Sequence, residues 1–493
     1  MQSLYLTCIL CPMNKKIIVT VLALFVTMLT FAQGTVRGFV FDQTTGEPVP
    51  FTNVILLGTD HGAQTNLDGV FLLPKVKKGT YTIQITNVEF TTHKEEITVT
   101  DGQITKFQVE LKKGTVIDQV DITASQKAQK IDPMVSVNSV NKEDIERIPS
   151  MGGESDVLTA LSTTTGVVTT GDQGGQVYVR GGTPIQNKVL LDGMTIYNPF
   201  HSIGFFSVFD TELIKNVDIH TGGFGAKFGG RVSSIMDISY RDGNTKKFSG
   251  KVSVSPFMAR TYLETPLFKA KKKGGSSGSL ILSAKKSLIE YSSKGIYPYT
   301  NDGEGMPFSF LDIYGKMSFK AGGGSKVSLF GFNFNDKVGY EGLDLGWNSY
   351  GGGLNFTVVP SSNPILIQGK INFSNYKINM KEDNSPQRFS EIFGFEGGFD
   401  FTYFLPKSSE INYGISIGGF KTNFETYNEV NRKIQLENFT TEIGVYVSYR
   451  AVIKKIFVLE PSFRMQYYAS VPKGFSAEPR LAMKINAHDK FRI

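Results

Sequence analysis

Residues 174–234 contain three glycine-rich blocks: Gly-Gly-Gln-Val-Tyr-Val-Arg-Gly-Gly (174–182), Lys-Val-Leu-Leu-Asp-Gly-Met (188–194) and Ala-Lys-Phe-Gly-Gly-Arg-Val-Ser-Ser (226–234). Residues 177–180 and 189–191 are short apolar segments typical of β-strands. Each runs into Gly-Gly or Asp-Gly, where a positive φ angle costs little and a tight turn follows. The blocks therefore predict a compact, glycine-rich α+β unit.

In this order the three blocks resemble the plug domain of TonB-dependent outer-membrane receptors. A glycine-rich phosphate-binding loop is a poor alternative, because no Gly-Lys-Ser/Thr completes it. The resemblance implies that the plug sits inside a β-barrel and that its outward loops help to bind the substrate. The positions that match the plug motifs are Arg180, Gly181, Gly182, Asp192, Gly193, Gly229, Gly230 and Arg231.

The resemblance also implies that arginines of the plug pair with carboxylates on the barrel wall, which makes Arg180 and Arg231 the candidates. A buried arginine would need an inward-facing Asp or Glu as its partner. A surface arginine at a turn is the alternative for each. His201 and His220 have no neighbouring set of ligands in the sequence, so neither is assigned to a metal or to catalysis.

We expect the plug to occupy residues 130–240 and to contain two short helices. Asn141 is the predicted N-cap of the first helix, and acidic residues follow it in the first turn. Residues 154–161 are the predicted second helix, with apolar side chains on one face.

Composition agrees with a β-sheet protein. Among the 493 residues are 38 Phe, 20 Tyr and 52 Gly but one Trp, which suits sheet that faces lipid or packs against sheet. The formal net charge is +7, yet Lys and Arg are interspersed with Asp and Glu instead of forming a basic stripe. We therefore expect no nucleic-acid partner.

The N-terminus resembles a secretory signal peptide. Two lysines precede an apolar run over residues 17–31, and small residues follow it. The run is short for a membrane span, so we predict a signal peptide over residues 1–33, cleaved beside Ala32 or Gln33. Met13 begins a complete signal by itself, which leaves open whether residues 1–12 are translated. Both cysteines lie before the run, so the mature chain is cysteine-free and neither a zinc site nor a disulfide is expected.

Residues 34–113 read as a small β-sandwich. Six strand-length segments are separated by turn signals such as Thr-Gly-Glu-Pro and Leu-Asp-Gly. The pattern of residues 37–50 and 65–71, with Gly79-Thr-Tyr after them, resembles the carboxypeptidase-regulatory-like domain, whose matched residues are turn and core positions without catalysis. His61 and His93 are read as ordinary surface or turn histidines.

Residues 114–129 form an extended, β-prone linker between the sandwich and the plug. A plain linker strand is one interpretation. The favoured one is that this segment resembles the TonB box, which offers an extra strand to the energy-transducing partner through backbone hydrogen bonds. The TonB-box positions are Ile117, Asp118, Val120, Asp121, Ile122, Thr123 and Ala124.

From residue 241 to residue 493, polar and apolar residues alternate with a period of two, as in half-buried strands. Lumen-facing positions carry charges such as Glu396, Asp400 and Arg464. Short connections, for example 322–325 and 360–364, alternate with connections read as longer, at 286–309, 335–347, 381–390, 425–437 and 469–477. We therefore expect the short set to face the periplasm and the long set the outside.

This count gives about twelve strands of an antiparallel transmembrane β-barrel, with a thirteenth opening at the C-terminus. Plugged transporters close with about 22 strands, so the chain is expected to be C-terminally truncated. The predicted fold class is mainly β: an N-terminal β-sandwich, a small α+β plug and the first part of the barrel.

The leading functional hypothesis is an outer-membrane receptor of a Gram-negative cell that imports an extracellular ligand with energy supplied through TonB. The expected partners are the TonB complex, outer-membrane lipid and a small-molecule, glycan or peptide ligand, and the sequence leaves open whether a surface lipoprotein caps the barrel. The alternative is a non-transporting surface-binding or signalling protein, or a non-functional truncated remnant. No nucleophile elbow, zinc site or paired carboxylates are present, so neither an enzyme nor a cofactor is predicted.

Overall fold

The computed structural model describes residues 34–114, 137–149, 155–170, 175–201, 204, 206–272, 274–299, 301–405, 409–453 and 456–486. Three units follow one another along the chain: a sandwich unit (residues 34–114), a plug unit (the described residues between 137 and 240) and a barrel sheet that contains strands β17 to β28. The predicted signal peptide lies outside the described residues. No helix within the described ranges is long and apolar enough to cross a membrane.

The sandwich unit consists of a three-stranded sheet, ordered β4-β1-β7, and a four-stranded sheet, ordered β3-β2-β5-β6. Apolar side chains from both sheets, such as Val36, Phe71 and Ile83, form its core. The six predicted strands are present, and the very short β3 is additional. The strands are β1 (Gly34–Asp42), β2 (Asn53–Leu56), β3 (Gly62–Gln64), β4 (Val70–Val76), β5 (Gly79–Asn87), β6 (Phe90–Val99) and β7 (Ile104–Leu111).

The plug unit is built on a five-stranded sheet ordered β12-β11-β16-β15-β8. Both predicted helices are present: Asn141 caps α3 (Lys142–Glu146) with a complete capping box, and Asp156 caps α4 (Val157–Ser162). The strands of this sheet are β8 (Val137–Val140), β11 (Asn187–Leu191), β12 (Met194–Thr195), β15 (Ile214–His220) and β16 (Ser234–Tyr240). The hairpins β9 (Val167–Thr170) with β10 (Gln176–Val179), and β13 (Phe200–His201) with β14 (Phe206–Ser207), complete it together with the 3-10 turns Pro184–Gln186 and Thr211–Leu213.

The barrel sheet has twelve strands, and each pairs antiparallel with the next along the chain. This confirms the predicted strand count. The strands are β17 (Ser249–Val254), β18 (Met258–Phe268), β19 (Ser277–Ser287), β20 (Phe308–Lys320), β21 (Lys326–Tyr340), β22 (Leu343–Val358), β23 (Ile365–Glu382), β24 (Arg388–Phe404), β25 (Glu410–Tyr427), β26 (Lys433–Ile453), β27 (Phe457–Tyr468) and β28 (Phe475–Ile485).

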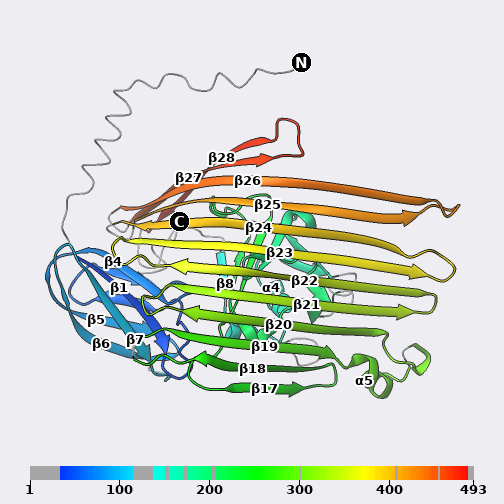
Figure 1. Cartoon of the computed structure of the whole chain (residues 1–493), viewed down its shortest axis with the longest axis horizontal. Helices are drawn as coiled ribbons and strands as arrows, with labels where there is room; N and C mark the ends of the chain where they lie inside the picture. The colour runs from blue at the N-terminus through cyan, green and yellow to red at the C-terminus, as the bar shows by residue number, and fades with distance from the viewer. Residues whose placement is uncertain are drawn as a thin grey trace.

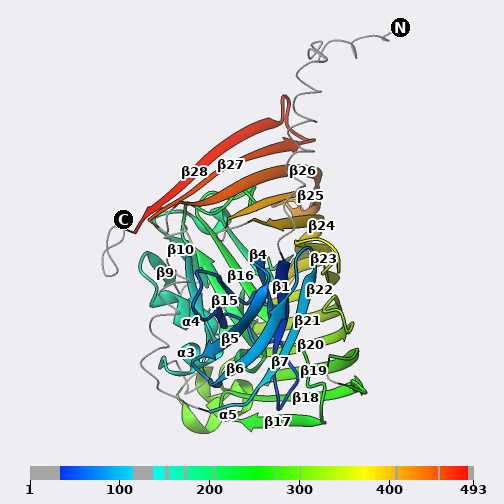
Figure 2. The same cartoon turned by 90° about the vertical axis from the view of Figure 1, so that its left-hand side faces the viewer.

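Side chains of the barrel sheet alternate between its two faces as the period of two predicts. Along β20, Asp312, Tyr314 and Lys316 are buried, whereas the alternating residues Leu311 and Ile313 are exposed. The sheet curves around the plug unit, which lies on its concave side (Figure 2). The outward face is therefore apolar, whereas the face toward the plug unit carries both polar residues and buried aromatic residues such as Phe330 and Phe332.

The predicted long connections are wrong in three places. Strands β21 to β26 are 15 to 21 residues long and run through most of residues 335–347, 381–390 and 425–437. The connections that remain are residues 341–342, 383–387 and 428–432. These polar stretches looked like loops, but cross-strand backbone hydrogen bonds extend through them, and Gly342, Asn384 and Asn431 supply the positive φ angles of the turns.

The connection between β19 and β20 is long, as predicted, and carries α5 (Ile289–Ile296) and the 3-10 turn Asn301–Gly303. It lies at the end of the barrel sheet opposite the sandwich unit (Figure 1). The sandwich unit packs at the other end, where Phe39 and Phe41 form one apolar cluster with Val359 and Leu366. The sandwich unit, the plug unit and the barrel sheet therefore meet at this end.

Candidate functional site

The turn after β11 is held by the inner wall of the barrel sheet. Asp192 is buried at a φ of 49°, and its carboxylate accepts hydrogen bonds from the Tyr314 hydroxyl (2.6 Å) and the Lys316 ammonium (3.1 Å). The next carbonyl, that of Gly193, accepts a hydrogen bond from Lys370 Nζ at 2.9 Å. The Asp-Gly motif is thus both a tight turn and a polar anchor between the plug unit and two separate parts of the wall.

A second anchor lies beside it. Lys188 Nζ is 2.5 Å from Glu396 Oε1, and the Thr195 hydroxyl donates to the same oxygen at 2.6 Å. Lys370 lies 3.4 Å from the other oxygen of Glu396. Glu396 therefore points toward the plug unit, which confirms its predicted lumen-facing position.

The third motif, residues 226–231, receives arginines from the wall. Arg464 Nη1 donates to the carbonyls of Ala226 and Lys227, each at 3.2 Å. A Cβ at Gly229 would lie 2.3 Å from Arg464 Nε, so only glycine lets this guanidinium approach. The Lys227 ammonium in turn pairs with Asp400 at 3.2 Å. Asp400 and Arg464 thus face the lumen, as predicted.

The two arginines that the resemblance singled out lie differently. Arg231 donates within the plug unit, to the carbonyls of Asn187 (3.3 Å) and Gly230 (2.7 Å). Arg180 is exposed at a φ of 48°, and its side chain passes close to Gly166. Two arginines of the wall, Arg464 and Arg480, donate hydrogen bonds to carbonyls of the plug unit.

The Gly181-Gly182 pair after Arg180 forms the turn that ends β10. Gly181 has a φ of 78°, and the Gly182 N–H donates to the Val179 carbonyl at 2.8 Å. A Cβ at Gly182 would lie 2.3 Å from Ser233 Oγ. Gly181 thus supplies the positive φ angle of the turn, and Gly182 lets the first block pack against Ser233 of the third block.

His201 makes contacts that no sequence motif predicts. It is fully buried, with Nδ1 2.8 Å from Asp336 and Nε2 2.7 Å from Asp312, and its ring stacks on Phe310 with centroids 4.2 Å apart. Burial alone would lower its pKa, but the two carboxylates raise the pKa of His201 to about 9. The partners lie 111 and 135 residues away along the chain, so no local motif could reveal them. The His201 side chain therefore links the plug unit to the wall through two ion pairs.

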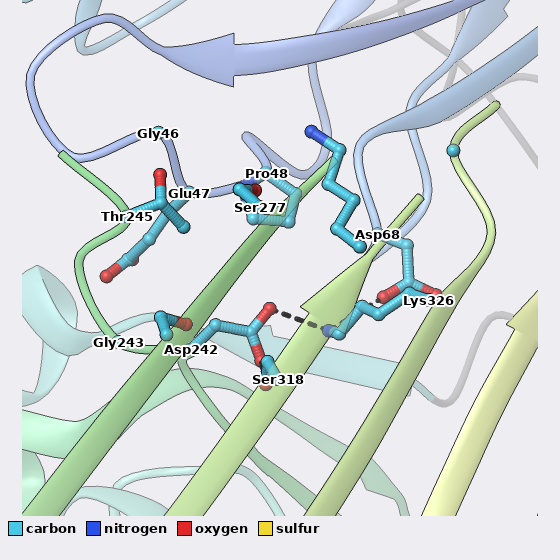
Figure 3. Close-up of a pocket in the computed structure, with 13 residues that line it drawn as sticks. Gly46, Glu47, Pro48, Asp68, Asp242, Gly243, Thr245, Ser277, Ser318 and Lys326 are labelled. Atoms are coloured by element: carbon cyan, nitrogen blue, oxygen red, sulfur yellow. Dashed lines mark hydrogen bonds and ion pairs between the residues drawn. The ribbon is translucent and has the colours of Figure 1, made fainter. Parts of the chain in front are cut away.

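A third set of contacts joins all three units (Figure 3). Lys326 of β21 lies 2.7 Å from Asp242, which follows the plug unit, and 3.1 Å from Asp68 of the sandwich unit. The Ser318 hydroxyl donates to Asp242 and the Thr357 hydroxyl to Asp68, both at 2.7 Å. Burial would raise the pKa of Asp242, but Lys326 and other neighbouring lysines hold it well below its usual range.

Arg241 supports the same junction, since its Nη1 lies 2.9 Å from Glu47 of the sandwich unit and 2.6 Å from Glu264 of β18. We call the contacts of Arg241 and Lys326 with their four carboxylates the three-unit junction. The predicted TonB-box residues, 117–124, lie outside the described residues. Within those described, no group of three or more His, Cys, Asp or Glu side chains is arranged to hold a metal ion.

Comparison with known proteins matches two families to the chain. Residues 36–122 match the CarboxypepD_reg-like domain, and residues 129–234 match the TonB-dependent Receptor Plug Domain. The TonB-dependent receptor SusC of Bacteroides thetaiotaomicron is 28% identical over 194 residues, 38% of this chain and 18% of SusC. The TonB-dependent transporter Oar of Myxococcus xanthus is 23% identical over 235 residues, 45% of this chain and 22% of Oar. The chain thus matches about a fifth of the length of these curated relatives.

Solved structures share the fold. The siderophore receptor PirA from Acinetobacter baumannii superposes with a TM-score of 0.54 at 15% identity, covering 74% of this chain and 61% of PirA. The outer membrane transporter YddB from Escherichia coli gives 0.52 at 12% identity, covering 72% and 59%. A curved antiparallel sheet with an α+β unit on its concave side is the architecture of a plugged outer-membrane β-barrel. In its two matched domains and in its fold, the chain is similar to TonB-dependent receptors that carry an N-terminal carboxypeptidase-regulatory-like domain.

Proposed function

We propose that the protein is an outer-membrane receptor that binds an extracellular ligand and imports it with energy supplied through TonB. The observation that carries the proposal is the way the plug unit is held: its second and third glycine-rich blocks contact the wall through ion pairs and hydrogen bonds. Polar contacts of this kind can be replaced by water one at a time, so the plug unit is a closure that a pulling force can remove. No covalent chemistry is involved.

The proposed division of the chain follows from this role. Residues 1–33 would direct export and be removed, residues 34–113 form the sandwich, 114–129 the TonB-box linker, 130–240 the plug and 241–493 the barrel part. The sandwich and the short turns beside it would face the periplasm, where TonB reaches the linker. The outward apolar residues, such as Phe395, Ile417 and Val445, are exposed and would face lipid.

The ligand would bind at the end away from the sandwich. The similarity to a siderophore receptor is similarity of fold, at 15% identity, and does not select a ligand class. Small molecules, glycans and peptides all remain within the proposal, because specificity depends on side chains of the outer loops.

The proposal is tested by binding of the purified full chain to the purified periplasmic domain of TonB. Proline at Val120 or Ile122 removes a backbone N–H and blocks strand pairing, so V120P or I122P should abolish binding. Q126P, in the same linker but outside the TonB box, is the matched control and should bind like the unaltered chain. Binding that survives both box variants would contradict TonB coupling and favour a surface-binding receptor that transports nothing.

A further inference from the structure

A cavity of about 70 Å³ with a mixed polar and apolar lining lies between the plug unit and strands β23 to β26. Charged and polar side chains line it from both sides: Lys188, Tyr197 and Arg231 from the plug unit, and Asn372, Glu396 and Glu442 from the wall. Both signs of charge are present, and the volume accommodates a few water molecules.

Glycines of the wall create this space. Gly394 and Gly418 face the plug unit at the cavity, and a Cβ at Gly394 would lie 2.0 Å from the Tyr197 hydroxyl. At Gly418 an added Cβ would lie 3.3 Å from the Phe395 carbonyl oxygen and 3.6 Å from Glu396 Cγ, so a side chain there needs a shift of a few tenths of an ångström to extend into the cavity. The wall is therefore recessed where the plug unit meets it.

Asn372 marks the cavity as hydrated. Its side chain is 3% exposed, and neither its Oδ1 nor its Nδ2 has a hydrogen-bond partner among the described residues. A buried amide without partners costs about 1 to 3 kcal/mol for each group, so water must satisfy it. This part of the interface is therefore wet.

The part of the wall on the other side of β22 is packed differently. Apolar side chains of β19 to β21, namely Ile281, Tyr314, Phe330, Phe332 and Phe334, belong to the same buried cluster as the core of the plug unit. In the described part of the chain, the clusters shared with the plug unit contain no residue of β23 to β28. Separating the plug unit from β19–β21 would expose apolar surface to water, whereas separating it from β23–β26 would mostly exchange polar contacts for hydration.

We propose that, in this stretch of wall, the passage for the imported ligand opens between the plug unit and strands β23–β26, starting at the hydrated cavity. The plug unit stays attached to β19–β21 and swings away from β23–β26 about that contact. The charged lining of both signs suits a hydrophilic ligand. This inference rests on the proposed import function for its purpose but not for its test.

The test compares two single cysteines introduced into a C8S/C11S background of the full chain. N372C lies in the cavity, and S283C lies in β19, where Ser283 is 6% exposed and donates to Asp210 at 2.6 Å. The purified variants, reconstituted in lipid vesicles, are reacted with the small cation 2-(trimethylammonium)ethyl methanethiosulfonate. We expect N372C to react at least about tenfold faster than S283C, because labelling follows the local opening of each contact. Equal rates, or faster labelling of S283C, would overturn the proposal.

A variant that fills the cavity tests whether the fast labelling of N372C depends on the cavity. G418M projects into the cavity and should slow labelling of N372C by about tenfold. G397M is the matched control: Gly397 alternates with the inward-facing Glu396, and the nearest atoms to an added Cβ are 3.7 Å away. If both variants slow labelling equally, the cavity is not the point of opening.

Labelling in living cells separates this inference from the proposed function. An N372C to S283C ratio above ten in vesicles, without any change when cells are de-energised with a protonophore, would contradict TonB-driven import while supporting the position of the opening. A ratio near one in vesicles would contradict the inference whatever the cells show.

Discussion

Replacing Lys326 by methionine should open the three-unit junction. Lys326 is 14% exposed and joins Asp242 and Asp68, which are 7% and 13% exposed. With an effective dielectric constant of about 20, each of the two contacts is worth roughly 5 to 6 kcal/mol before the desolvation of the charges is subtracted. Measured losses on removing one partner of such buried pairs are about 3 to 5 kcal/mol, because the remaining charge stays buried without compensation.

The assay is the rate at which a cysteine introduced by S277C is labelled. Ser277 lines the small cavity of the junction and is 7% exposed. A loss of about 3 kcal/mol in the closing equilibrium should raise this rate by about 100-fold, since 1.36 kcal/mol corresponds to a factor of ten. The variant D68N/D242N/K326M leaves no charge of the triad unpaired and should recover most of the difference. K421M is the matched control, because Lys421 and Glu437 form a pair with both side chains about half exposed.

Two results would refute this reasoning. One is a change of less than about threefold in K326M, which would mean that the ion pairs do not hold the sandwich unit in place. The other is a triple variant that labels as fast as K326M, because the loss would then come from packing and not from unpaired charge.

Two further predictions concern the plug unit. G229A should destabilise the folded chain by about 1 to 3 kcal/mol, because its Cβ would lie 2.3 Å from Arg464 Nε, whereas G323A, with no atom within 4 Å, should leave the thermal unfolding midpoint within a degree or two. The pKa of His201 is raised from 6.5 to about 9, so its contribution to stability is complete below about pH 6.5 and is lost as the pH rises to about 9. The free energy of unfolding of the unaltered chain, measured with denaturant, should therefore fall by about 3 kcal/mol more than that of H201N over this pH range. Parallel curves of unfolding free energy against pH would contradict the ion pairing of His201.

The local features of the fold could be predicted from the sequence. Asn141 caps a helix as its side chain and the following acids indicate, and the alternation around Asp312 and Tyr314 gives the faces of β20. Such features depend on neighbours a few residues apart, which a sequence displays directly. The strand tips around residues 341 and 384 could not be predicted, because polar residues in a two-sided ladder have no apolar alternation to reveal them.

The site was predictable only as a set of motifs. The sequence identifies the blocks that contain Asp192 and Gly229, but their partners Lys316 and Arg464 lie more than 120 residues away and are determined by the register of the sheet. The sequence does not reveal the contacts of His201 for the same reason, since its two carboxylates are brought together only when β20 and β21 pair. Long-range contacts follow from strand order and register, which no short motif encodes.

The most direct test of the central claim is the labelling rate of N372C in energised cells with TonB and in the same cells lacking TonB. If the plug unit is a closure that TonB pulls open, labelling should be faster when TonB is present, and V120P should remove the difference. Equal rates in the two strains would contradict TonB-driven opening of this receptor.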